Sequence, residues 1–141
     1  MADRRTRSEY IKEIAESLIA NEESLSHLRD ADIRIGYLES EWGKKTAHKH
    51  IMGECEKIPE RYKWAIPYDF TVTVFNPNVG LLNKNQLRAL VFHELLHIGV
   101  TDDAKGQFYI VPHDVEDFYT ILDRYGLRWN IPEDLPENPV G

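Results

Sequence analysis

The chain has 141 residues, of which 42% are hydrophobic and 29% are charged, and its formal net charge is −7. This length and composition predict one soluble globular domain with a single core and argue against a disordered chain. The acidic balance argues against a dedicated surface for nucleic acid or for an anionic membrane.

The N-terminal segment and the cysteine content bear on the compartment. The first eight residues are basic, but no apolar stretch follows them, so we expect no signal peptide. No run is long enough to span a bilayer. The single cysteine, Cys55, excludes an intramolecular disulfide, so the sequence does not call for an oxidising compartment. These features predict a cytoplasmic protein.

In chain order, the first half alternates between helical and extended patterns. Apolar residues at helical spacing predict a helix from Ser8 to about Arg29, with Ser8 as its N-cap. Alternating residues predict a strand over Asp32–Leu38. A polar connection from Glu39 to Lys49 follows, and then a second strand over Ile51–Ile58, ended by a proline.

Three potential metal ligands fall in this half, namely His48, His50 and Cys55. Their spacing matches no zinc-ligand signature, so we interpret both histidines as exposed loop residues.

The middle of the chain gives the clearest patterns. β-Branched and aromatic residues predict a strand over Phe70–Phe75. A helix is predicted over Lys84–Ile98. Asn83 and Gln86 would form its capping box, and Gly99 would end it as a C-cap glycine.

This helix carries His93, Glu94 and His97 in the pattern His-Glu-x-x-His. Two imidazoles four residues apart lie one turn apart on one helical face, so both can reach the same metal ion. The other faces are apolar, which indicates a buried helix, and polar side chains there are costly without partners. The pattern is typical of a zinc peptidase, with the glutamate holding a water at the metal.

A catalytic zinc site needs a third protein ligand. After a polar turn at Asp102–Gly106 and a short strand over Gln107–Val111, the chain reaches His113 at the start of a helix that ends near Gly126. We expect His113 to be the third ligand. Glu116 is the alternative, because it lies nearly one turn further along the same face, and the residue that does not bind would orient a ligand imidazole.

Chemistry would follow from the metal. Zinc lowers the pKa of its bound water towards ~7 and polarises a carbonyl group. Glu94 would take the proton of the water and pass it to the leaving amine. An edge strand can hold an extended peptide by main-chain pairing, and Phe70–Phe75, just before the motif helix, is the predicted strand.

Three segments together resemble the phage metallopeptidase family, and the resemblance spans roughly residues 8–129. These segments are His93–His97, Pro112–Phe118 and Asp123–Leu127. At longer range the chain is similar to SprT-like zincins, in which a histidine that opens the later helix completes the metal site. That resemblance implies the same role for His113, and a zinc-dependent peptidase-like domain from a phage or prophage, working in the cytoplasm of the host cell.

We therefore predict an α+β, zincin-like single domain over residues 1–129, with a small sheet packed on the motif helix and helices on its flanks. Residues 130–141 are predicted to be a proline-rich, acidic tail. The predicted function is hydrolysis of a peptide or protein substrate, with no role for nucleic acid or membranes. The alternative is a non-catalytic binding module, stabilised by zinc, that engages a host or phage protein.

Overall fold

The computed structural model describes residues 5–46, 49–80, 82–101 and 107–112. Its elements are β1 (Arg5–Arg7), α1 (Glu9–Asn21), a 3-10 helix (Glu23–Leu25), α2 (Ser26–Asp30), β2 (Ile35–Ser40), β3 (Lys44–Thr46), β4 (Lys49–Ile51), β5 (Gly53–Lys57), a second 3-10 helix (Glu60–Tyr62), β6 (Phe70–Phe75), α3 (Asn76–Val79), α4 (Lys84–Leu95), β7 (Ile98–Val100) and β8 (Phe108–Ile110). The predicted segments Asp102–Gly106, 114–126 and 130–141 lie outside the described residues.

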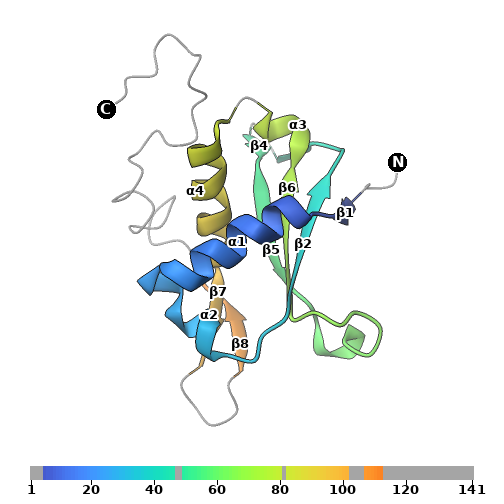
Figure 1. The fold of residues 1–141 in the computed structure, drawn as a ribbon. Coiled ribbons are helices and arrows are strands. Elements are labelled where there is room, and N and C mark those ends of the chain that lie inside the picture. Colours follow the sequence, from blue (N-terminus) through green and yellow to red (C-terminus); the bar gives the residue numbers. More distant parts are fainter. Residues whose placement is uncertain (1–4, 47–48, 81, 102–106, 113–141) are drawn as a thin grey trace.

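A four-stranded sheet with the order β1-β2-β6-β5 organises the chain (Figure 1). β2 and β6 are parallel, whereas β1 and β5 pair antiparallel with their neighbours, so the sheet is mixed. Two small antiparallel hairpins, β3–β4 and β7–β8, flank it. The described part of the chain is thus a small α+β domain, which confirms the coarse fold class.

The core lies between this sheet and two helices, α1 and α4, that pack on the same face (Figure 1). Every second side chain of β6 points towards the helices, and each helix contributes one apolar stripe to the core. The fully buried members of these elements include Phe70 and Val72 from β6, Ala15 and Leu18 from α1, and Val91 and Leu95 from α4. β6 is an inner strand of the sheet, because β2 and β5 occupy its two edges.

The predicted N-terminal helix is divided into several pieces. Ser8 is the N-cap, and its hydroxyl accepts a hydrogen bond from the backbone N–H of Ile11, as expected. The prediction of one helix to Arg29 is wrong, because the backbone becomes extended at Glu22 and restarts as a 3-10 helix and α2. The turn lets Leu25 point back into the core, where it is fully buried.

The predicted connection over Glu39–Lys49 is also wrong in part. β2 extends to Ser40, and the following residues form the β3–β4 hairpin. Asn78 of α3 fastens this hairpin, since its side-chain amide donates to the carbonyls of Lys44 at 3.0 Å and Ile51 at 2.6 Å. The strand predicted over Ile51–Ile58 is confirmed as β5.

The motif helix begins where the sequence predicts, with the capping box of Asn83 and Gln86 formed on both sides. It ends three residues earlier than predicted, at Leu95, and Gly99 is not its C-cap but a residue of β7. Pairing with β8 explains the difference. The ring of Tyr109 lies so close to Gly99 that an added Cβ would approach it to 2.5 Å, so the glycine serves strand packing. No helix in the described ranges has the length and apolar character needed to cross a membrane.

Candidate metal centre

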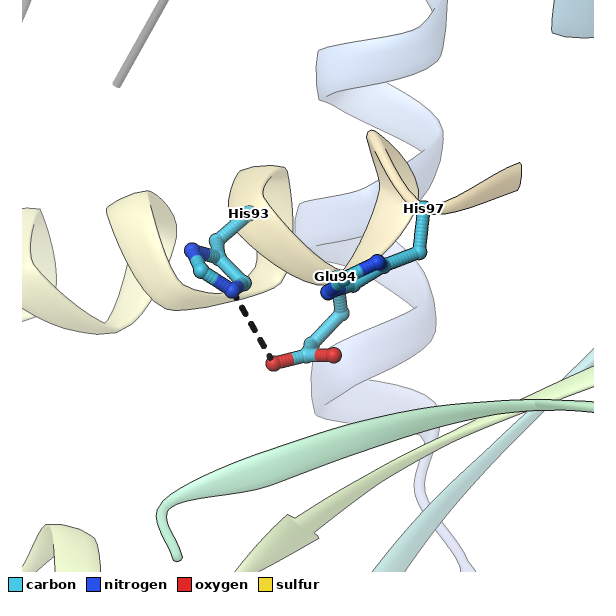
Figure 2. Close-up of side chains that lie close together, drawn as sticks. All are labelled: His93, Glu94 and His97. Carbon is cyan, nitrogen blue, oxygen red and sulfur yellow. Dashed lines mark ion pairs between the residues drawn. The ribbon is translucent and has the colours of Figure 1, made fainter. Parts of the chain in front are cut away.

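The last turn of α4 and the two-residue turn that follows it bring three polar side chains together (Figure 2). One ligand atom each of His93, Glu94 and His97 lies within 4.8 Å of the others. The two imidazole rings are 5.3 Å apart between centroids, and Nε2 of His93 is 4.0 Å from Oε2 of Glu94. Spacings of this size place all three side chains around one point that a single cation could occupy.

The β7–β8 hairpin orients His97. The Nδ1 atom of His97 lies 2.7 Å from the carbonyl oxygen of Val111, and the backbone N–H of Val111 donates to the carbonyl of His97 at 2.7 Å. Because a carbonyl oxygen only accepts, Nδ1 must carry the proton. In the neutral ring Nε2 is then the unprotonated nitrogen, the arrangement that metal-binding histidines use.

Glu94 is a buried carboxylate, with 4% of its surface exposed. It points away from the helix towards β5 (Figure 2), where it meets Gly53. A Cβ added at Gly53 would lie 3.3 Å from Oε2 of Glu94 and 3.1 Å from the carbonyl oxygen of Thr73. The missing side chain at Gly53 therefore provides the space that the carboxylate occupies.

Cys55, two residues along β5, faces the same side of the sheet as Gly53. Its burial, together with the negative charge of Glu94, raises the pKa of the thiol well above its ordinary value. The thiol is therefore protonated at neutral pH, whereas a thiolate is needed to bind metal or attack a substrate. In the described part of the chain, Cys55 is not a member of any cluster of three metal-ligand residues.

The predicted site residues thus divide into two sets. His93, Glu94 and His97 come together as a group suited to a metal. His113, Glu116 and His48 lie outside the described residues, so their predicted roles stay predictions. Gly53 and the carbonyl of Val111 were missed. A glycine within a strand is a signal for close approach of another group, whereas no sequence signal identifies a backbone carbonyl partner.

The predicted substrate strand is corrected by the sheet order. Phe70–Phe75 forms β6, and both of its edges are occupied, one by β2 and the other by β5. It therefore has no edge left for a peptide. The outer strand on the side of the metal centre is β5, whose second edge pairs with no strand in the described ranges.

Fold and site together define a small α+β domain with a helix-borne His–Glu–His group that can hold a metal ion. A family model described as "Putative phage metallopeptidase" matches residues 3–135. The chain belongs to this family. The family suggests a metal-dependent peptidase and implies a peptide or protein substrate. Comparison with curated proteins and with solved structures gives no match.

Proposed function

We propose that the protein is a zinc-dependent peptidase in which His93 and His97 bind the metal and Glu94 is the general base. The observation that carries the proposal is the convergence of the three ligand atoms within 4.8 Å, with the carboxylate buried. Imidazole nitrogens at this spacing suit zinc, and family membership supports hydrolysis of a peptide bond.

The hydrogen bond between His97 and Val111 supports His113 as the third ligand. Val111 is held directly against the imidazole of His97. His113 follows two residues later, and two residues of chain reach at most about 7 Å. Glu116, the alternative, is five residues from Val111 and would need the chain to turn back.

Each side chain would have a separate task. Bound zinc would supply a Lewis acid that polarises the carbonyl and lowers the pKa of water. Glu94 would accept a proton from the attacking water and deliver it to the leaving amine. Gly53 leaves room for the carboxylate of Glu94, and contact with β5 at this position would restrict the movement of that carboxylate.

The outer edge of β5 supports a role in holding the peptide. The N–H of Phe75 donates to the carbonyl of Met52, and the N–H of Ile58 donates to the carbonyl of Asp69. With the register of the β5–β6 ladder, these bonds place Gly53, Cys55 and Lys57 in the pairs whose backbone groups point away from β6. A substrate strand could pair with these outward groups beside Glu94. This arrangement, an antiparallel edge strand next to the metal helix, also supports a zincin-like packing of the domain.

Zinc content and hydrolysis test the proposal. We expect about one zinc ion per chain in the wild type by mass spectrometry, and loss of zinc in His93→Ala, His97→Ala and His113→Ala. Glu94→Gln should keep zinc but cleave casein, an unfolded protein, at least about 100-fold more slowly than the wild type. Zinc retained by both His93→Ala and His97→Ala would refute the site.

X-ray absorption of the zinc-loaded protein separates the enzyme from the alternative. Three protein ligands plus a water are expected of the enzyme, whereas four protein ligands would indicate a zinc-stabilised binding module. A zinc ion bound by four protein ligands, together with no cleavage of casein, would refute the peptidase proposal in favour of the binding module.

A further inference from the structure

The loop between β5 and β6, residues 58–69, exposes three large apolar side chains. Trp64 is 87% exposed, Tyr62 is 46% exposed and Ile66 is 38% exposed. In Figure 1 this loop projects from one end of the sheet. Exposed aromatic residues gathered on one segment are unusual on a soluble domain and mark binding surfaces more often than isolated ones do.

Hydrogen bonds and ion pairs hold this loop in a defined shape. The N–H groups of Ala65 and Ile66 both donate to the carbonyl of Tyr62. The Nζ atom of Lys63 lies 3.0 Å from a carboxylate oxygen of Glu60 and 3.0 Å from one of Asp69. These bonds close the backbone around residues 62–66, so the segment that carries Trp64 is ordered and would lose little backbone conformational entropy on binding.

The loop also carries positive charge, although the whole chain is acidic. Residues 57–69 contain three cations, Lys57, Arg61 and Lys63, and two carboxylates, Glu60 and Asp69. Both carboxylates contact Lys63. The guanidinium of Arg61 stacks on the ring of Tyr62, 4.8 Å from its centroid. Arg61 therefore places a cation beside the apolar side chains, which favours a partner that is both apolar and acidic.

The position of the loop connects it to the proposed substrate strand. β5 begins at Gly53, against Glu94, and ends at Lys57, from which the loop starts. Four residues of extended chain span about 13 Å. A peptide paired along the outer edge of β5 would therefore leave the metal centre and reach the loop after four or five residues.

We propose that this loop is a substrate-recognition surface, which binds an apolar and acidic segment of an unfolded protein four or more residues from the cleaved bond. The inference rests on the proposed function, because it assumes that the peptide follows β5. Trp64 and Ile66 would bury the apolar side chains of that segment, and Arg61 would pair with its carboxylates. The charge pattern would make the protein discriminate against basic unfolded segments.

Binding to full-length, zinc-loaded Glu94→Gln tests this without cleavage. The probes are fluorescein-labelled peptides of about 20 residues with a neutral centre, flanked on both sides by Leu-Glu, Leu-Lys or Ser-Glu repeats, a length that spans β5 and the loop in either direction. We expect the Leu-Glu peptide to bind at least about fivefold more tightly than the others. Adding Trp64→Ser or Arg61→Ser should abolish this preference.

Trp42 provides the matched control. It is 41% exposed and follows the far end of β2, at the opposite end of the sheet from the loop. Trp42→Ser should leave the preference among the peptides unchanged. Equal binding of all three peptides, or a preference that survives Trp64→Ser, would overturn the inference. Binding of phosphatidylserine vesicles or of a thymidine oligonucleotide that depends on Trp64, without any preference among peptides, would also overturn it.

The two proposals can fail separately. If wild-type protein with zinc does not cleave casein while the Leu-Glu preference is present, the peptidase proposal fails and the recognition surface stands. If cleavage occurs and Trp64→Ser leaves the KM for casein unchanged, the recognition surface fails and the peptidase proposal stands. If the recognition surface is correct, Trp64→Ser should raise the KM for casein about fivefold above the wild-type value and leave kcat unchanged, because the lost contact lies far from the cleaved bond.

Discussion

Replacing Gly53 by alanine tests how closely β5 positions the carboxylate of Glu94. The added Cβ would lie 3.3 Å from Oε2 and 3.4 Å from Cγ of Glu94, and the first of these is tighter than ordinary van der Waals contact. It would also lie 3.1 Å from the carbonyl oxygen of Thr73, which belongs to the inner strand β6 and cannot easily move. The strain is therefore relieved by a shift of Glu94 or of β5.

A shift of a few tenths of an ångström in a general base is enough to slow proton transfer. Misplacement by about 1 Å can reduce catalysis by about 100-fold, so we expect Gly53→Ala to lower kcat on casein by about tenfold. The fold should survive, because overpacking costs about 1–3 kcal/mol and the alanine offsets part of that by its lower chain entropy. Zinc content should stay at the wild-type value, since the three atoms nearest to the new methyl group belong to Thr73 and Glu94 and not to a histidine.

Two comparisons make this result specific. Gly80→Ala is the control, because among the described residues a Cβ there would meet only a carbonyl oxygen, that of Asn76, at 3.8 Å, and kcat should not change. In the Glu94→Gln background, Gly53→Ala should have little further effect on the remaining rate, since both changes act on one group. A wild-type kcat in Gly53→Ala, or an equal loss of rate in both backgrounds, would refute the reasoning.

Three further predictions concern stability. Asn83→Ala removes one side of the capping box of α4 and should lower the free energy of unfolding by about 1 kcal/mol in urea titrations, with Asn85→Ala, inside the helix, as the control. In zinc-free protein, the Cys55 thiol has a folded-state pKa above its ordinary 9.0, so the unfolded chain ionises first. Stability should be constant below about pH 8 and fall by up to about 1.4 kcal/mol per unit between about pH 9 and pH 10, whereas Cys55→Ala should lack this decline. Above about pH 10 the buried Tyr37, whose pKa is also raised, should lower the stability of both proteins. Zinc at 100 times its Kd should stabilise the chain by about 2.7 kcal/mol in thermal unfolding, and an equal gain in His97→Ala would contradict binding at this site.

Local signals in the sequence were sufficient for the elements that local chemistry determines. The start of α4 follows from Asn83 and Gln86, which cap the helix through contacts between residues only three positions apart. β6 follows from its β-branched and aromatic residues, and the convergence of His93 with His97 follows from helical periodicity.

Features that depend on distant partners could not be predicted in this way. The helical spacing continues through Leu25 and Leu28, so nothing local shows that the chain turns at Glu22. Gly99 fits a helix C-cap, but pairing of β7 with β8 prevails over it. The order of strands in the sheet is set by which surfaces meet after folding, so only the three-dimensional structure shows that β5 is an outer strand among the described residues.

The contact between His97 and Val111 has a thermodynamic consequence. The imidazole and the backbone of His97 both bond to Val111. The conformation in which the β7–β8 hairpin is closed is therefore also the one in which the His97 ring has the orientation described for metal binding. A metal ion that selects this ring orientation must then stabilise the hairpin, and whatever closes the hairpin must raise metal affinity by the same free energy. Under the proposed function, residues of β7 and β8 that do not contact the ion are therefore expected to change its dissociation constant through the hairpin.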